Sequence, residues 1–481
     1  LTEIVVALAR SSPLVLAIED TQWADEESVA WLDHVLGRSA GRALWMMITA
    51  RPSFWREGPE RYAGRDHVRL DLRPMGKKQL RAIAKAVLGE KATNKPGEEL
   101  AESIAAQAAG SPLFAEELSR LAAQGRDAKT APTIEAAMQV QLDALDDAAR
   151  EAAARLAVFG ITGWDAGLAA LGVSGAQDVL RSLTSSEVLL EQATSRFRDT
   201  REWLFKHAIM REVAYASLSD EALRAAHAAA GHWLAKMAED DATVARHFEL
   251  GGEAELAAVH MERAARRALA ANALEQAVQL ADKSLAFAND KPTAFARAQL
   301  LDEAWSRLDA RAAERDSAVR AMEESVFDAP SELRARGARL RYEDACGGGP
   351  DTTARLLAVR RDAEAAGLLD EEARCAAVLA TRYAFAGDLE EATAMAHHLL
   401  ALGQRPVSAW AAVEGWQTLA VVHQTRGDLA AALDARRSAV QAARGAGLKT
   451  REATLTINVG FALTTVGAEA EARAAIEAGI H

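Results

Sequence analysis

The sequence predicts a mainly α-helical protein, with a short α/β part near its N-terminus and an α-solenoid of helix-turn-helix repeats in its C-terminal half. Half of the 481 residues are apolar but only 5% are aromatic, which favours closely packed helices over a β-sandwich. Two apolar, strand-like runs flank a helix-like stretch near the N-terminus, as in a parallel βαβ unit. A short motif recurs with a period of 40 residues in the C-terminal half, which indicates stacked repeats.

The first strand-like run covers residues 13–18 and ends in Glu19 and Asp20. Acidic groups at the carboxyl end of a parallel strand lie where such sheets bind their ligands. Mg²⁺ prefers hard oxygen ligands, and a second carboxylate can orient an attacking water. Glu19 is therefore a candidate metal ligand and Asp20 a candidate catalytic residue. An apolar strand that ends in two acidic residues is equally common in α/β proteins without such a site.

A helix-like stretch, residues 26–36, leads to the second run at 43–48, which is followed by Thr49-Ala50-Arg51-Pro52. Arg51 would face the same edge of the sheet as Glu19 and Asp20. A planar guanidinium there could contact the γ-phosphate of a nucleotide and report whether ATP or ADP is bound. The alternative is a surface arginine before a proline that begins a helix.

These motifs resemble those of STAND ATPases, the signal-transduction ATPases with numerous domains. Residues 14–25 resemble the Walker B region of that family, an apolar strand with two acids and Trp23-Ala24-Asp25, and Thr49-Ala50-Arg51-Pro52 is similar to its sensor strand. The resemblance implies ATP or ADP with Mg²⁺ as cofactors, with Thr49 and Arg51 at the nucleotide.

The resemblance continues downstream. Residues 70–74 resemble the junction into a helical lid, and residues 110–118 resemble the lid motif, in which Pro112 would pack on the adenine. Helix capping alone would also explain Gly110-Ser111-Pro112. Residues 205–215 resemble a winged-helix signature, which implies a phosphate contact for His207. A lone histidine before an apolar helix is more often a packing residue.

The phosphate-binding loop of such ATPases is not found in this sequence. A P-loop needs Gly-x-x-x-x-Gly-Lys-Ser/Thr, because its backbone N–H groups cradle the phosphates. The one Gly-Lys pair, Gly76-Lys77, is followed by Lys78 and comes after the acidic strand. Glu19 also stands where the family usually has aspartate. We expect that an N-terminal part with the P-loop is missing and that this chain alone is inactive. The hypotheses for its parent are an ATPase and a Ser/Thr kinase.

The repeat motif is Gly387-Asp388 and Gly427-Asp428, followed by Gly467-Ala468, each 40 residues after the last. Counting back by 40 reaches Gly347 and then Arg307. Each unit is predicted to be a helix, a glycine turn and a second helix, and the repeats resemble tetratricopeptide repeats with longer helices. No polar capping helix follows the last unit, so we expect the repeat array to continue beyond it.

Charge and composition bear on the partners. The net charge of −13 disfavours a sequence-independent grip on nucleic acid, so no direct nucleic-acid binding is expected. A local basic cluster leaves that question open, and it consists of Arg196, Arg198, Arg201, Lys206 and Arg211. Only two cysteines occur, and no apolar stretch reaches the ~18 residues of a membrane span. We expect a cytoplasmic protein without a membrane partner.

Four domains are predicted. They are the C-terminal part of a P-loop ATPase core (1–73), a helical lid (74–131), a winged-helix domain (132–238) and tetratricopeptide-like repeats (239–481).

The functional hypothesis is an ATP/ADP switch coupled to the sensing of a protein or small-molecule ligand by the repeats. It would regulate an attached effector outside this chain, such as a Ser/Thr kinase or nucleotide cyclase, and oligomerisation on activation is possible. The alternatives are a nucleotide-independent repeat scaffold for protein–protein interaction and a part of a LuxR-like transcription regulator.

Overall fold

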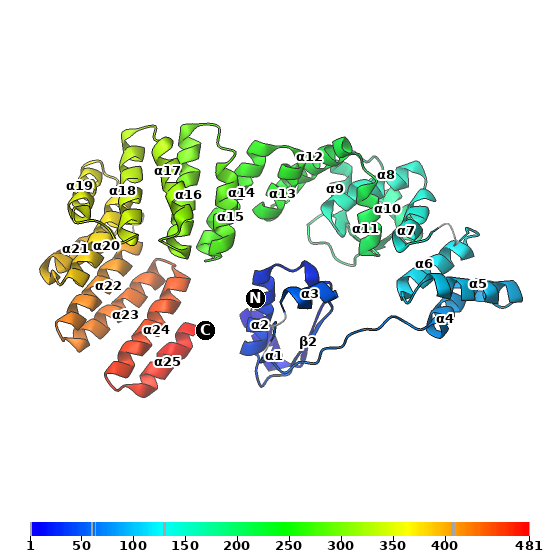
Figure 1. Cartoon of the computed structure of the whole chain (residues 1–481), viewed down its shortest axis with the longest axis horizontal. Coiled ribbons are helices and arrows are strands. Elements are labelled where there is room, and N and C mark those ends of the chain that lie inside the picture. The colour runs from blue at the N-terminus through cyan, green and yellow to red at the C-terminus, as the bar shows by residue number, and fades with distance from the viewer. Residues whose placement is uncertain (1, 59–60, 63, 128–130, 406–408, 481) are drawn as a thin grey trace. The chain divides into compact units, whose positions relative to one another are not determined.

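The computed structural model describes residues 2–58, 61–62, 64–127, 131–405 and 409–480. The chain divides into two compact units, Leu1–Arg126 and Asp127–His481, and each is described by itself (Figure 1). Most described residues are helical, so the prediction of a mainly α fold with a C-terminal solenoid of helical hairpins is confirmed.

The first unit opens with a small α/β element. Strands β1 (Leu14–Ile18) and β2 (Leu44–Ile48) pair in parallel, from Leu14 opposite Leu44 to Ile18 opposite Ile48. Helix α2 (Glu26–Arg38) connects them, because a parallel pair needs a crossover. Helices α1 (Thr2–Ser11) and α3 (Pro52–Glu57) flank this βαβ unit in the chain.

The two strands are covered on one face only. Ile18, Met46 and Ile48 pack against a cluster from α2 and α3 that includes Val29 and Phe54. Their neighbours point the other way, and Val15 and Trp45 are each 60% exposed. Within the described residues, helices therefore cover a single side of this two-stranded sheet.

Residues 66–76 follow as an exposed segment without helix or strand. Three helices come next, α4 (Lys77–Leu88), α5 (Lys95–Gln107) and α6 (Pro112–Ala123). They pack through Leu80, Ile104 and Leu118, each of which is at most 1% exposed. These helices form a small bundle with its own apolar centre.

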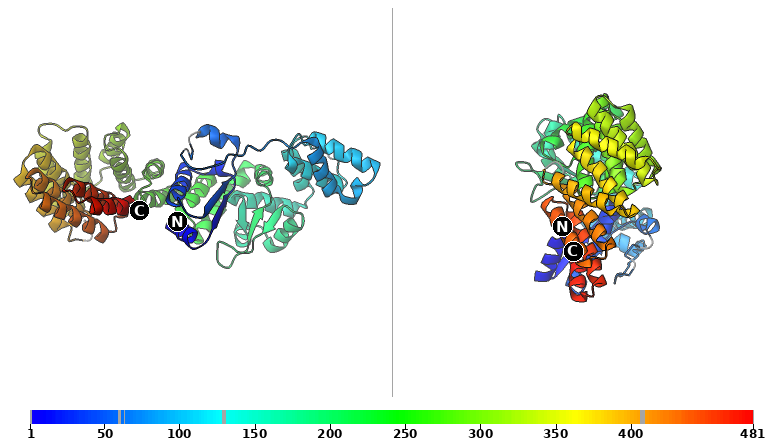
Figure 2. Two further views of the ribbon diagram at one scale, coloured as in Figure 1. Left: turned by 90° about the horizontal axis from the view of Figure 1, so that it is seen from below. Right: turned by 90° about the vertical axis from the view of Figure 1, so that its left-hand side faces the viewer.

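The second unit begins with helices around a three-stranded antiparallel sheet of order β3-β5-β4, drawn as arrows in Figure 2. Trp164, Phe197, Trp233 and Phe248 share one hydrophobic cluster with Met261. The elements are α7 (Ile134–Asp143), α8 (Asp147–Leu156), β3 (Thr162–Trp164), α9 (Asp165–Ala170), α10 (Ala176–Ser185), β4 (Leu189–Glu191), β5 (Glu202–Phe205), α11 (Ala208–Ala216) and α12 (Asp220–Lys236). The cluster crosses the predicted boundary at 238/239, so no separate core ends there.

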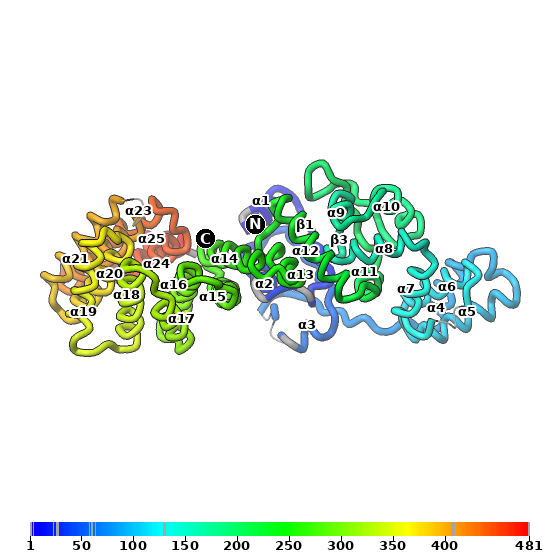
Figure 3. Tube along the Cα trace, turned by 90° about the horizontal axis from the view of Figure 1, so that it is seen from above, coloured from blue at the N-terminus to red at the C-terminus, as the bar shows by residue number. Residues whose placement is uncertain are grey.

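Helices α13 to α25 form the solenoid, in which successive helices pack side by side (Figure 3). Their bounds are α13 (Asp241–Gly251), α14 (Ala254–Ala270), α15 (Leu274–Leu285), α16 (Lys291–Leu308), α17 (Ala313–Glu324), α18 (Ala329–Ala345), α19 (Thr352–Ala365), α20 (Leu369–Ala386), α21 (Leu389–Leu402), α22 (Trp410–Thr425), α23 (Leu429–Gly445), α24 (Lys449–Thr465) and α25 (Glu469–Ile480).

The same backbone hydrogen bond recurs at the turns that follow the 40-residue period of the sequence. The N–H groups of Gly348, Asp388, Asp428 and Ala468 each donate to the carbonyl five residues before them, at 2.8 to 3.0 Å. Each bond closes the end of one helix over a glycine with positive φ. The turn predicted near Arg307 differs, because α16 ends at Asp309 in extended backbone. The four turns of the 40-residue motif therefore share one construction, and the turns at Gly367 and Gly447 share it as well.

None of the described helices is both long and apolar enough to cross a membrane. Of the two cysteines, Cys346 is exposed and Cys375 is buried, and both are free thiols. Burial, together with repulsion from the neighbouring Glu371 carboxylate, raises the pKa of the Cys375 thiol to about 12. Cys375 therefore behaves as a small apolar residue of the solenoid core.

Two histidines are buried together where α12 meets α13. The Nδ1 atoms of His227 and His247 lie 3.1 Å apart, and the Tyr215 hydroxyl lies 2.8 Å from His227 Nε2. Burial, together with repulsion from Arg211 and Arg246, lowers the pKa of His227 from 6.5 to about 4. Burial likewise lowers the pKa of His247 to about 4, helped by His227 and Arg246. Both rings are therefore neutral at pH 7.

This pair predicts acid sensitivity of the second unit. Because the folded pKa values lie below 6.5, the unfolded chain binds more protons as the pH falls from about 6.5 to 4, and stability is lost over that range. We expect the free energy of unfolding to fall by at least about 2 kcal/mol. Urea unfolding monitored by tryptophan fluorescence at several pH values measures it. His247→Gln should flatten this dependence.

The matched control is His232→Gln, which alters an exposed histidine on α12. It should leave the pH dependence as it is. Equal slopes for the two variants would show that the buried pair does not cause the acid sensitivity.

Candidate functional site

The predicted acidic and sensor residues meet at one edge of the β1-β2 sheet. Because the strands are parallel and Ile18 is opposite Ile48, Glu19 and Asp20 leave the sheet beside Thr49 and Arg51. The Thr49 N–H donates to the Ile18 carbonyl at 2.9 Å. The structure thus brings together four of the six predicted site residues.

Thr49 fixes the turn that follows β1. Its hydroxyl accepts a hydrogen bond from the Asp20 N–H at 3.3 Å. Its carbonyl accepts from the N–H of Thr21 at 3.0 Å and from the Thr21 hydroxyl at 3.1 Å. Thr21 is buried at 2% exposure. Thr49 therefore has a local structural role that the sequence did not reveal.

Gln22 connects the acidic and sensor segments and was not among the predicted site residues. Its Nε2 donates to Asp20 Oδ1 at 3.0 Å, and its Oε1 accepts from the Arg51 N–H at 3.0 Å. The signal in the sequence was its position between the two acids and Trp23-Ala24-Asp25. The side chain of Trp23 lies outside the described residues. Gln22 therefore holds Oδ1 of Asp20 through a hydrogen bond.

Asp20 adopts a left-handed backbone conformation with φ 54° and ψ 38°. Aspartate and asparagine tolerate this conformation better than most non-glycine residues. Strain of this kind clusters at functional sites. The turn begins a short 3-10 helix (Thr21–Trp23) and leads to Asp25, which caps α2 by accepting from the Ser28 N–H at 2.6 Å.

Glu19 and Asp20 are both exposed carboxylates. Across the described ranges, no group of three or more His, Cys, Asp or Glu side chains could enclose a metal ion. Mg²⁺ in nucleotide sites is held by one or two carboxylates, with phosphates and water supplying the other ligands. The residues present fit that arrangement, and they do not fit a metal site built from protein side chains alone. The Mg²⁺ role of Glu19 stays a prediction.

Arg51 and Pro112 both lie at helix starts. Arg51 is exposed at the N-cap of α3, where Pro52 occupies the first turn. Pro112 begins α6, and its neighbour Ser111 caps the helix by accepting from the Phe114 N–H at 3.2 Å. The capping explanation of Gly110-Ser111-Pro112 therefore holds. The adenine contact of Pro112 remains a prediction.

The two lid motifs contact each other. The Met75 N–H donates to the Gly110 carbonyl at 2.9 Å. A Cβ added at Gly110 would lie 2.5 Å from Cβ of Pro74, and Gly110 has φ +97°. Gly110 is thus required both for its backbone conformation and for the close approach of Pro74. The segment that ends at Met75 is thus held against the start of α6.

His207 belongs to the second unit, at the N-cap position of α11 in extended backbone. Its predicted phosphate contact stays a prediction. The basic cluster around it is largely neutralised: Arg196 pairs with Glu239 at 2.6 Å and Lys206 with Glu187 at 2.6 Å. Arg201 lies 3.5 Å from Glu191, and the Arg211 Nε donates to the Ala157 carbonyl.

Substitution of Gly110 tests the contact between the lid motifs. Gly110→Ala should destabilise the α4–α6 bundle through its positive φ and through overlap with Pro74, by about 2 to 4 kcal/mol in total. Gly125→Ala is the matched control, because Gly125 has φ +80° and nothing within 4 Å of an added Cβ. Hydrogen exchange of the α4–α6 amides measures both. Equal losses of amide protection in the two variants would show that the contact with Pro74 does not contribute to the destabilisation.

No protein-family model and no curated protein matches this sequence. Among solved structures, the chain is similar to a Signal Transduction ATPase with Numerous Domains (STAND) protein with a tetratricopeptide repeat sensor from Pyrococcus horikoshii. The TM-score is 0.47 at 13% sequence identity, over 98% of this chain and 75% of that one. At this level the similarity carries no argument about function.

Proposed function

We propose that this chain is the sensor-bearing part of a STAND-type signalling ATPase. In this proposal the carboxyl edge of β1 and β2 is the acidic and sensor part of an ATP/ADP site, and the solenoid senses a protein or small-molecule ligand. The observation that carries it is the Gln22 bridge, which joins Asp20 to Arg51 through hydrogen bonds of 3.0 Å at each end.

Each residue of the edge has a chemical role in the proposal. Glu19 would hold Mg²⁺, which neutralises the phosphate charge when bound. Asp20, held by Gln22 through one oxygen, orients the attacking water with the other. Arg51 contacts the terminal phosphate and distinguishes ATP from ADP. Thr49 keeps the Asp20 and Arg51 segments at a fixed separation through its bonds to Asp20 and Thr21.

The proposal requires a phosphate loop, which these 481 residues do not contain. Two exposed apolar features support an α/β element that is completed by further helices and strands. Val15 and Trp45 lie on the open face of the β1-β2 sheet, although parallel sheets are ordinarily covered on both faces. Val68, Leu70 and Leu72 alternate along the exposed segment and are 79 to 95% exposed, a pattern typical of an unpaired strand.

The helices that follow the βαβ unit also have roles in this proposal. The α4–α6 bundle would be the lid, and helices α7 to α12 with their three-stranded sheet would be the winged-helix domain. An effector such as a Ser/Thr kinase or nucleotide cyclase would lie outside this sequence, which has no His-Arg-Asp or Asp-Phe-Gly motif. A ligand that binds the solenoid more tightly in one nucleotide state would shift the switch toward that state.

A nucleotide-independent scaffold is the second candidate function. The observation that favours it is the joint absence of a phosphate loop from this sequence and of aspartate at position 19. In that case the edge residues would only stabilise the turn after β1.

Nucleotide binding by the chain together with the upstream sequence of its gene separates the two candidates. We expect micromolar or tighter ATP binding that Asp20→Asn leaves within about threefold, because asparagine tolerates the same backbone conformation. Hydrolysis should fall by about 10²- to 10⁴-fold. Arg51→Ala should reduce the preference between ATP and ADP by about tenfold. Fluorescent-nucleotide titration and phosphate release measure these effects.

Asp66→Asn and Arg56→Ala are the matched controls, since both residues are exposed and lie outside the edge. Neither should change binding or hydrolysis. The ATPase proposal fails if the gene encodes no Gly-x-x-x-x-Gly-Lys-Ser/Thr upstream, or if the wild-type protein binds no nucleotide.

A further inference from the structure

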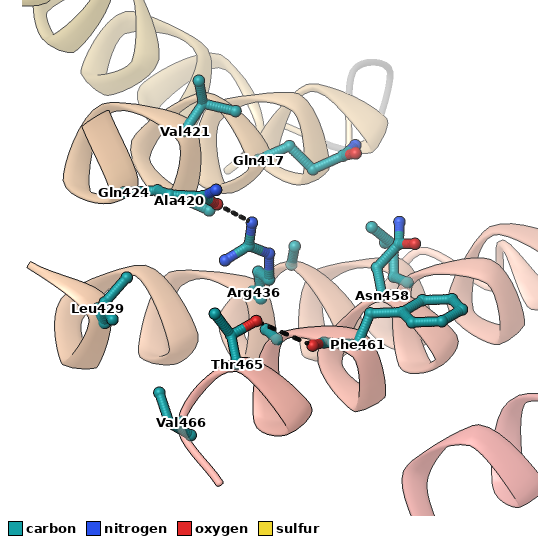
Figure 4. Close-up of a pocket in the computed structure, with 13 residues that line it drawn as sticks. Gln417, Ala420, Val421, Gln424, Leu429, Arg436, Asn458, Phe461, Thr465 and Val466 are labelled. Carbon is teal, nitrogen blue, oxygen red and sulfur yellow. Dashed lines mark hydrogen bonds between the residues drawn. The ribbon is translucent and has the colours of Figure 1, made fainter. Parts of the chain in front are cut away.

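A cavity of about 410 Å³ lies among helices α22, α23 and α24 (Figure 4). Its volume is within the range of small-molecule sites, roughly 300 to 1,000 Å³. The lining combines polar side chains, among them Gln424, Arg436 and Asn458, with an apolar wall that includes Leu429, Leu455 and Phe461. Neither the nucleotide edge nor the lid takes part in it.

The preceding repeat has much smaller residues at two of the cavity's positions. In the preceding repeat, the position of Arg436 is occupied by Ala396, which is fully buried, and the position of Leu455 by Gly415. A Cβ added at Gly415 would lie 2.8 Å from the Ala396 carbonyl, so α21 and α22 are in close contact there. Arginine and leucine cannot fit into such a contact. Arg436 and Leu455, the larger residues at the same two positions, both line the cavity.

Arg436 is half-buried and lacks an acidic partner. Its guanidinium donates to the Gln424 Oε1, and across the described residues no carboxylate lies within 4 Å of it. Other shielded arginines of the solenoid do have such partners: Arg315 pairs with Asp302 at 2.8 Å and Arg297 with Glu262 at 3.3 Å. Arg436 therefore presents an uncompensated positive charge to the cavity, and it is the one charged residue in the lining.

The rest of the lining suits an amphipathic molecule. Phe461, Val466 and Leu429 are 60%, 46% and 44% exposed, although all three are large apolar residues. Figure 4 shows Arg436 beside Gln424 and across from the α24 residues Asn458 and Thr465. A charged donor at one place and an open apolar wall at another are the two features of a site that orients its ligand.

We propose that this cavity binds a small organic monocarboxylate with an apolar or aromatic body. The planar guanidinium donates two parallel hydrogen bonds to a carboxylate, whose single charge compensates its own. Phe461 and Leu455 would cover the apolar body. Binding here does not depend on the nucleotide site. Only the step from binding to signalling rests on the proposed function.

Calorimetric titration of the 481-residue chain with 4-phenylbutyrate tests the proposal, with 4-phenylbutyramide as the neutral analogue. We expect saturable 1:1 binding of the carboxylate and at least tenfold weaker binding of the amide. Arg436→Ala, which restores the residue of the preceding repeat, should weaken carboxylate binding by roughly tenfold or more. Arg437→Ala is the matched control: it removes the same charge from the next residue, which pairs with Glu471 at 3.5 Å and does not line the cavity.

Arg436→Gln is the second variant, should the alanine variant not fold, and thermal unfolding checks the fold of each protein. The proposal is overturned by absence of saturable carboxylate binding to the wild type, by equal affinity for acid and amide, or by equal effects of the Arg436 and Arg437 substitutions. No nucleotide is present in this experiment. Its failure would therefore leave the ATPase proposal standing, and failure of the ATPase proposal would leave this site standing.

Discussion

The solenoid depends on the close approach of helix backbones at alanine and glycine. An added Cβ at Gly403 would lie 2.5 Å from Ala412, and one at Gly460 would lie 3.0 Å from the Ala472 carbonyl. Interiors packed to this density leave almost no room for an additional methylene group. The small residues therefore determine the distance between neighbouring helices and, through it, the geometry of the whole array. A single contact with larger residues is enough to change the local shape of the surface.

Ion pairs between helices fix which residues face each other, which small apolar residues do not. Arg315 pairs with Asp302 and Arg341 with Glu371, and in both pairs the acid comes from a different helix than the arginine. A buried pair adds little net stability, but an arginine shifted away from its acid would cost several kcal/mol. Alanine-rich helix faces alone specify the register of neighbouring helices weakly, whereas these ion pairs oppose a shift of one helix along the next. The repeats thus combine uniform packing with residue-specific alignment.

The parts predictable from sequence were those governed by local rules. Glycine at 387, 427 and 467 predicted the turns, because positive φ is a property of single residues, and parallel strand ends predicted that Glu19, Asp20 and Arg51 meet. The Gln22 bridge, the left-handed Asp20 and the buried His227–His247 pair escaped prediction, because each depends on tertiary contacts between separate elements. The open face of the sheet was missed for a related reason: an apolar run predicts burial but does not identify the covering element. The cavity beside Arg436 was not predicted either, because it depends on how three helices pack together.

The segment of residues 66–76 has a mechanical consequence. Residues 66–73 have neither helix nor strand, and their side chains are exposed, so they resist bending and twisting far less than a stack of helices does. Such a tether transmits tension once it is extended, but it transmits no compression or torque. A rotation of the βαβ element therefore cannot turn the α4–α6 bundle through the chain itself. Any torque between them has to pass through a body that touches both.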